Sequence, residues 1–161
     1  MKQQLKLLPR LSLLEEDERT CKAVLESQQY QNAKWIFAFI PLDDEPAIHP
    51  VLYDALEHKN LALPITEDDG EMQFYPLRSL NDLRQGRYNI PEPPKTQAID
   101  PDELTLILVP AVAYRADGVR LGRGKGYYDR YLSKTSGAYT LGVCRSYQLV
   151  EDLVPDRWDK S

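Results

Sequence analysis

The sequence contains few of the residues that build metal centres or nucleophilic triads. Among 161 residues there are two histidines, His49 and His58, and two cysteines, Cys21 and Cys144. So few histidines argue against a histidine-rich metal site and against Ser-His-Asp catalysis. The cysteines lack metal-binding spacing, so we expect reduced thiols packed as small apolar groups in a cytoplasmic protein. Any bound metal would need oxygen ligands, which favours magnesium.

Long apolar segments are also missing from the sequence. No run approaches the roughly 20 residues needed to span a bilayer. The start, MKQQLKLLPRL, has no apolar core and no small-residue cleavage site, so we expect no signal peptide. With 42% hydrophobic and 28% charged residues, the chain has the composition of one globular domain over residues 1–161, large enough to bury a core.

Positive charge is concentrated in one segment. The chain carries a formal net charge of −5, yet residues 114–134 hold six cations and two anions, a local net of +4. Such local charge suits a small anionic ligand in one cleft, whereas nucleic-acid proteins are more often basic over a whole face. The charged residues are Arg115, Arg120, Arg123, Lys125, Arg130 and Lys134, with Asp117 and Asp129.

Three glycines alternate with two of these cations. Gly122, Gly124 and Gly126 flank Arg123 and Lys125. Glycines at this spacing leave backbone amides uncovered, so that successive N–H groups can turn around an anion, aided by a helix starting at Gly126. The run is neither a P-loop nor a GxGxxG motif. Spacing alone therefore leaves two interpretations open, a phosphate-binding loop and a glycine-rich surface turn.

The remaining patterns predict alternating strands and helices. Apolar runs bounded by proline predict strands, and a helix between the first two gives a βαβ unit with a parallel sheet. Ser12 begins a capping-box pattern that opens an earlier helix, and Asp69-Gly70 indicates a hairpin turn. The expected strands cover residues 35–40, 61–64, 72–76, 104–109 and 139–144, and the expected helices begin at Ser12, Pro50, Ser79 and Gly126.

Four segments together resemble the 5-formyltetrahydrofolate cyclo-ligase (methenyltetrahydrofolate synthetase) family. The most specific is RLGRGKGYYDRYL, which follows the strand-like LTLILVPAVAYRADG. KWIFAFIPLDDE, NIPEP and LVEDLVPDRWD also resemble family segments and occur in the same order. The resemblance implies an α/β fold of three layers, a mostly parallel sheet flanked by helices, similar to the NagB/RpiA/CoA-transferase-like fold. It also implies a single cyclo-ligase-like domain over residues 1–161.

The resemblance implies a ligase that uses ATP and Mg²⁺ to cyclise 5-formyltetrahydrofolate to 5,10-methenyltetrahydrofolate in one-carbon metabolism. Arg123 and Lys125 would be catalytic, and Asp129 and Asp159 would bind the metal. The implied folate-binding residues are Ile40, Glu45, Tyr88, Arg123, Gly124, Lys125, Gly126 and Tyr127. The implied ATP-binding residues are Lys2, Lys6, Arg120, Leu121, Gly122, Arg123, Gly124, Lys125, Gly126, Tyr127 and Tyr128.

Several of these residues could have a structural role in place of the functional role that the resemblance implies. Lys6 stands where the family has arginine, so Lys2 and Lys6 also fit a solvated basic terminus. Tyr88 replaces a tryptophan and could either stack on folate or pin a proline-rich loop. Asp129 could simply complement a helix dipole, and Asp159 could belong to a charged tail.

Two other functions remain open. One is a non-catalytic nucleotide- or RNA-binding relative, although the net charge argues against RNA. The other is a sugar-phosphate isomerase or CoA-transferase relative on a similar fold. We expect small-molecule partners, no nucleic acid, no membrane and a monomer. In the last predicted helix, Tyr128, Tyr131 and Leu132 should face the core, and Tyr127 should lie off that face towards ligand.

Overall fold

A five-stranded mixed sheet forms the centre of the computed structural model. The order is β3-β2-β1-β6-β9, with β1 parallel to β2 and β6, β6 parallel to β9, and β3 antiparallel to β2. The structure describes residues 10–42, 45–67, 69–86, 89–110, 113–114, 120–121, 127–135 and 137–143. The strands are β1 (Trp35–Phe37), β2 (Asn60–Thr66), β3 (Met72–Leu77), β6 (Thr105–Pro110) and β9 (Tyr139–Val143).

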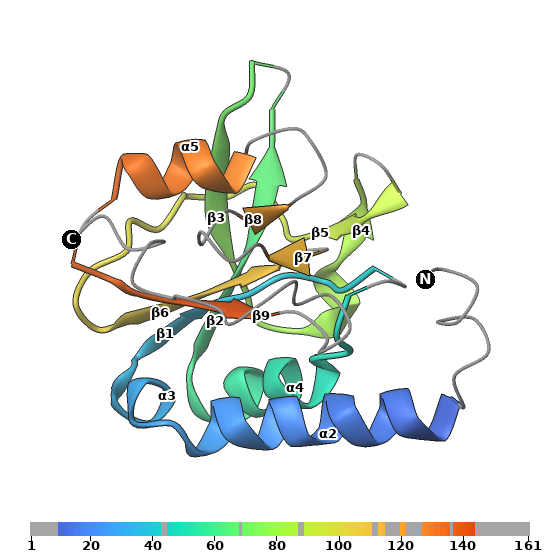
Figure 1. Ribbon diagram of the computed structural model, residues 1–161. Coiled ribbons are helices and arrows are strands. Elements are labelled where there is room, and N and C mark those ends of the chain that lie inside the picture. The colour runs from blue at the N-terminus through green and yellow to red at the C-terminus, as the bar shows by residue number, and fades with distance from the viewer. Residues whose placement is uncertain are drawn as a thin grey trace.

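Helices cover both faces of this sheet (Figure 1). On one face lie α2 (Arg10–Glu26), α3 (Gln28–Asn32) and α4 (His49–His58), and on the other lies α5 (Tyr127–Ser133). The predicted α/β class, with three layers and a mostly parallel sheet, is confirmed. The chain runs from β1 through α4 into the parallel β2, as the predicted βαβ unit requires.

The two core clusters follow from the alternation of side chains along the strands. In β6 all six residues are buried. Leu106 and Leu108 pack into the cluster beneath α2 and α4, whereas Ile107 and Val109 pack into the cluster beneath α5. Successive side chains of a strand point to opposite faces, so a continuous apolar run is what a sheet covered on both sides needs.

The helix α4 begins as its sequence predicts. Pro50 occupies the first turn, where its missing N–H removes no hydrogen bond. Val51, Leu52 and Ala55 are buried on one face. The expectation for the earlier helix was wrong at its start, because α2 begins at Arg10 and already contains Ser12. Ser12 therefore does not open the helix.

The strands β2 and β3 form the predicted hairpin. Thr66 pairs with Met72, and Gly70 in the connecting turn has φ +87°, a conformation that only glycine adopts without strain. On the outer edge of β3, the Ile99 N–H donates to the Phe74 carbonyl oxygen at 2.8 Å. The strand β3 pairs with β2 along one edge only, and this bridge occupies part of its other edge.

Several short elements differ from the sequence expectations. The first strand ends at Phe37 rather than Ile40, and the helical turn expected from Ser79 is the short η1 (Leu80–Asp82) with Ser79 as its cap. Two small antiparallel ladders were not predicted. They are β4 (Arg84–Gln85) with β5 (Pro91–Glu92), and β7 (Ala113–Tyr114) with β8 (Arg120–Leu121).

Candidate active site

The candidate site lies at the edge of the sheet where the parallel strands end. Because β1, β2 and β6 are parallel, their carboxyl ends lie at one edge, where ligands bind in open α/β sheets. The segment leading to Glu45 follows β1, Glu67 follows β2, and the segment that contains the glycine run follows β6. The topology therefore starts the segments that follow β1, β2 and β6 at one edge of the sheet.

Glu45 is the buried acid of this edge. Its residue is 6% exposed, which is rare for a carboxylate unless it is paired. The Leu42 N–H donates to Glu45 Oε1 at 2.8 Å, and the Glu45 N–H donates to the Leu42 carbonyl oxygen at 2.9 Å. These bonds hold the carboxylate in a fixed turn. Ile40, the neighbouring predicted residue, is half-buried and packs against the first core cluster.

The glycine run follows a small hairpin. Backbone pairing joins Ala113 to Leu121 and Tyr114 to Arg120, so β8 delivers the chain to Gly122. Helix α5 begins at Tyr127. Residues 122–126 thus connect the end of a strand to the start of a helix, the arrangement that nucleotide-binding loops use.

The first two residues of α5 are aromatic and half-buried. Tyr127 and Tyr128 both pack against the second core cluster, beside the buried Tyr131 and Leu132. The Tyr127 hydroxyl donates to the Glu67 carbonyl oxygen at 3.2 Å. The expectation that Tyr127 lies off the core face was therefore wrong. A two-turn helix that packs on the face of the sheet buries more of its first turn than a helical wheel indicates.

Asp129 lies in the first turn of α5 and is exposed. Its carboxylate has the oxygen chemistry that Mg²⁺ requires, and its position also suits the positive end of the helix dipole. Within the described parts of the chain, no group of three or more His, Cys, Asp or Glu side chains is arranged to hold a metal ion. The other ligands of a metal held by Asp129 would come from outside these residues, for example from phosphate oxygens.

Some predicted site residues lie outside the described residues, so their placement is not tested. For Arg120 and Leu121 only the backbone is described. Those outside are Lys2, Lys6, Tyr88, Gly122, Arg123, Gly124, Lys125, Gly126 and Asp159.

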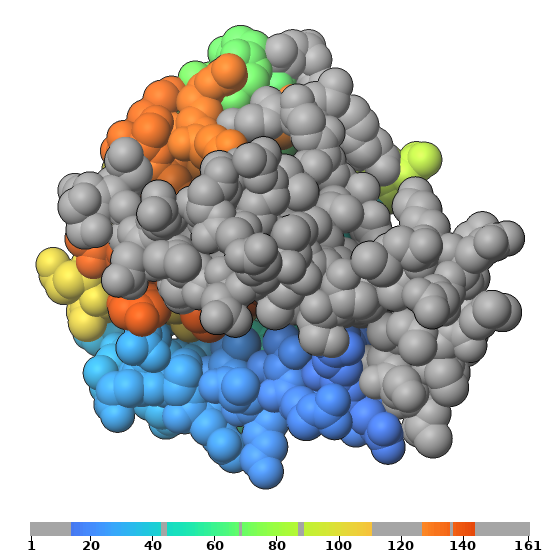
Figure 2. Space-filling model, viewed as in Figure 1, coloured from blue at the N-terminus to red at the C-terminus, as the bar shows by residue number. Residues whose placement is uncertain are grey.

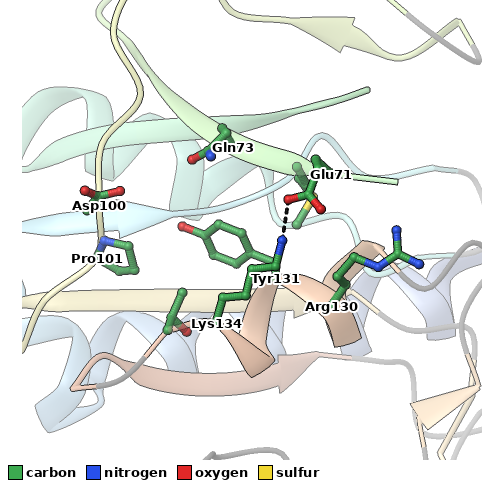
Figure 3. A pocket seen from close by; sticks show the side chains of 9 residues that line it. Glu71, Gln73, Asp100, Pro101, Arg130, Tyr131 and Lys134 are labelled. Atoms are coloured by element: carbon green, nitrogen blue, oxygen red, sulfur yellow. Dashed lines mark hydrogen bonds and ion pairs between the residues drawn. The ribbon is translucent and has the colours of Figure 1, made fainter. Parts of the chain in front are cut away.

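A pocket beside α5 was not predicted (Figure 3). It has a volume of about 270 Å³ and lies between α5, the start of β3 and the Asp100-Pro101 segment. Tyr131 projects into it, and its buried hydroxyl has no hydrogen-bond partner among the described residues. Burial raises the pKa of Tyr131 above its ordinary value, and the charge of Asp100 adds to this. The helical spacing had identified Tyr131 only as a core residue.

The sequence also did not predict that the turn between β2 and β3 contacts α5. Tyr127 and Glu67 are 60 residues apart in sequence, so no local pattern reports their contact. The charged pair of Lys134 and Glu71, 63 residues apart, joins the same two elements. In the part of the chain that the structure describes, no helix combines the length and the apolar character needed to cross a membrane.

Comparisons with known proteins agree with this fold. The profile of the 5-formyltetrahydrofolate cyclo-ligase family matches residues 1–161. A 5-formyltetrahydrofolate cyclo-ligase from Mus musculus is 28% identical, over 99% of this chain and 85% of its own length. The Haemophilus influenzae cyclo-ligase is 31% identical, over 84% of this chain and 75% of its own length.

Solved structures give the same result. The 5,10-methenyltetrahydrofolate synthetase of Aquifex aeolicus superposes with a TM-score of 0.77 and 32% identity, covering 94% of this chain and 77% of that one. The Mycoplasma pneumoniae synthetase superposes with a TM-score of 0.69 and supports the fold. The family resemblance seen in the sequence is confirmed: the chain belongs to the 5-formyltetrahydrofolate cyclo-ligase family, and it is a ligase.

Proposed function

We propose that the protein uses ATP and Mg²⁺ to cyclise 5-formyltetrahydrofolate to 5,10-methenyltetrahydrofolate, releasing ADP and phosphate. The observation that best supports this is the position of the Gly-Arg-Gly-Lys-Gly run. It connects β8 to α5 in a chain whose full length matches the cyclo-ligase family. We further propose one domain over residues 1–161.

The chemistry needs no protein nucleophile. The formyl oxygen attacks the γ-phosphorus of ATP, the bond to the β–γ bridging oxygen breaks, and ADP leaves. The neighbouring folate nitrogen then attacks the formyl carbon, loses its proton, and phosphate departs with the formyl oxygen. Because the substrate supplies both nucleophiles in one molecule, proximity lowers the barrier to ring closure. The protein's task is to position the substrates and neutralise charge.

We assign the charge-neutralising role to the glycine run. Arg123 and Lys125 would face the transferred phosphate, and the amides of residues 122–126 would surround the other phosphates. Arg120, Leu121, Tyr127 and Tyr128 would line the same nucleotide. Lys2 and Lys6 would approach it from the amino terminus.

We assign magnesium binding to Asp129 and Asp159. A bound magnesium would neutralise phosphate charge. The exposed carboxylate of Asp129, at the start of the helix after the glycine run, supports its part in this assignment. Its oxygen atoms fit a hard cation that keeps several waters and phosphate ligands.

We assign folate binding to the loop after β1. A pterin ring presents N–H donors, and a carboxylate accepts them. Glu45 is held in a turn beside the half-buried Ile40, so its carboxylate is preorganised for such recognition. Tyr88 would stack on an aromatic ring of the folate. Residues 123–127 would be shared between the two substrates.

A spectrophotometric assay tests the proposal. Purified protein is mixed with 5-formyltetrahydrofolate, magnesium and ATP, and the near-UV band of the methenyl product is followed. We expect a rise that requires all three components. ATP binding by calorimetry without any rise would instead support a nucleotide-binding relative. A cytoplasmic location, a monomeric state and the absence of a nucleic-acid partner stay predictions. One relative, from Arabidopsis thaliana, is named as mitochondrial.

A further inference from the structure

The turn between β2 and β3 contacts one side of α5 along the length of the helix. Two contacts come from Tyr127 and Arg130, at positions i and i+3 on one face of the helix. The third comes from Lys134, the residue that follows the helix. Figure 2 shows α5 (orange) packed beside the tip of the hairpin (green). We call Glu67, Asp69, Gly70 and Glu71 the hairpin turn.

Each of these three residues bonds to a different residue of the hairpin turn. The Tyr127 hydroxyl donates to the Glu67 carbonyl oxygen at 3.2 Å. Arg130 Nη1 donates to the Asp69 carbonyl oxygen at 3.3 Å. Lys134 Nζ forms an ion pair with Glu71 Oε1, and Figure 3 shows this pair beside Arg130.

Gly70 allows the central contact. A Cβ atom at this position would lie 1.7 Å from Arg130 Nη1, so any side chain there would displace the guanidinium from the turn. Gly70 also has φ +87°, which other residues rarely adopt. The backbone conformation therefore favours glycine, and the contact of Arg130 with the turn depends on the absence of a side chain there.

The hairpin turn is itself anchored to a second segment. Lys95 Nζ lies 2.7 Å from Glu67 Oε2, and Lys95 follows β5, in the stretch after the predicted folate residue Tyr88. The turn thus joins α5, which follows the glycine run, to the segment that follows the proline-rich loop.

We infer that the hairpin turn is a positioning element that holds α5 from its first residue to just past its last and, through the chain, fixes the glycine run that precedes the helix. This inference rests on the proposed function. Arg130, Lys134 and Glu71 act here as positioning residues, because they hold the helix rather than the nucleotide. Loosening their contacts would let the phosphate-binding amides depart from their working geometry, where small misplacements lower the rate strongly.

Charge reversal of one pair tests the inference. The variants are Glu71→Lys, Lys134→Glu and the double variant that restores the pair in the opposite order. Each single variant should raise the KM for ATP about three- to fivefold, the range that exposed ion pairs can contribute. The KM for folate should change less, and the double variant should return to within about twofold of wild type.

Glu71→Lys separates positioning from long-range electrostatics. Added positive charge attracts ATP, so a purely electrostatic effect would lower the KM for ATP, whereas lost positioning raises it. The matched controls are Glu57→Lys and Lys22→Glu. Both residues are exposed on α4 and α2, across the sheet from α5. Neither control should move the KM for ATP by more than about twofold.

A second readout does not depend on activity. Trypsin cleavage after Arg123 and Lys125, followed by mass spectrometry on the folded protein, reports how firmly the glycine run is held. Each single variant should accelerate cleavage several-fold, and the double variant should restore the wild-type rate. Unchanged cleavage and KM in both single variants, or a double variant that fails to recover, would overturn the inference. An inactive wild type with accelerated cleavage in the variants would refute only the proposed function.

Discussion

Removing the Tyr131 hydroxyl should stabilise the protein. This oxygen is buried in the pocket beside α5 and finds no hydrogen-bond partner in the part of the chain that the structure describes, while the centre of the ring lies 5.1 Å from that of Phe74. A buried polar group without a partner keeps its desolvation penalty, about 1–3 kcal/mol. Tyr131→Phe removes the penalty and keeps the ring. We expect a gain of about 1 kcal/mol, at the low end of this range.

The same substitution at Tyr30 should have the opposite effect on stability. Tyr30 is buried at 2% exposure, and its hydroxyl donates to Asp54 Oδ2 at 2.6 Å. A hydrogen bond to a charged group contributes about 1.5–3 kcal/mol. Tyr30→Phe therefore lowers stability by about that amount and leaves a carboxylate with one partner fewer. The two variants delete one oxygen each from buried tyrosines.

Thermal and urea unfolding measure both variants. For a chain of this size, 1 kcal/mol shifts Tm by about 2–4 °C, so Tyr131→Phe should raise Tm by about that much and Tyr30→Phe should lower it by roughly 3–12 °C. The urea m-value should stay unchanged, which would show that the unfolded states are comparable. If Tyr131→Phe destabilises the protein as much as Tyr30→Phe does, the hydroxyl has a partner in the pocket and the reasoning fails.

Three further predictions concern the site and the core. Arg123→Ala should lower kcat about 100-fold with a smaller change in the KM for ATP; an unchanged rate in the cyclisation assay would remove Arg123 from the catalytic role. Asp129→Asn should raise the magnesium concentration for half-maximal rate about tenfold, and excess magnesium should restore most of kcat. Burial, with a smaller effect of the Asp17 charge, raises the pKa of the Cys21 thiol in the folded protein. The stability that the protonated thiol contributes is therefore fully present below the ordinary thiol pKa of about 8.5, and it is lost as the pH rises above that value. Between pH 7.5 and 9.5 the unfolding free energy of wild type should fall more than that of Cys21→Ala, and equal slopes would contradict this.

The central layers of the fold could be predicted from the sequence. Continuous apolar runs such as residues 105–110 have no polar face, so they require cover on both sides of the sheet. Pro50 and the spacing of Val51, Leu52 and Ala55 predicted α4. Asp69-Gly70 predicted the β2–β3 hairpin, because few other residues adopt the positive φ that its turn needs.

The parts that could not be predicted depend on contacts distant in sequence. The pairing of Ala113 with Leu121 involves two-residue strands, which are too short for a periodic pattern. Tyr127 was placed wrongly because a helical wheel ignores the hairpin turn that its hydroxyl reaches. The start of α2 was predicted two residues late, since a capping-box pattern at Ser12 also fits inside a helix.

The outer edge of β3 affects whether copies of the protein associate with one another at high concentration. An exposed strand edge is a template on which other chains can add and aggregate. Here the Phe74 carbonyl oxygen already accepts the Ile99 N–H, and Pro76, two residues further along the strand, has no N–H to offer. Consecutive hydrogen bonds to an incoming strand are therefore blocked along this stretch. The loop that carries Ile99 thus protects the folded protein from self-association through this edge.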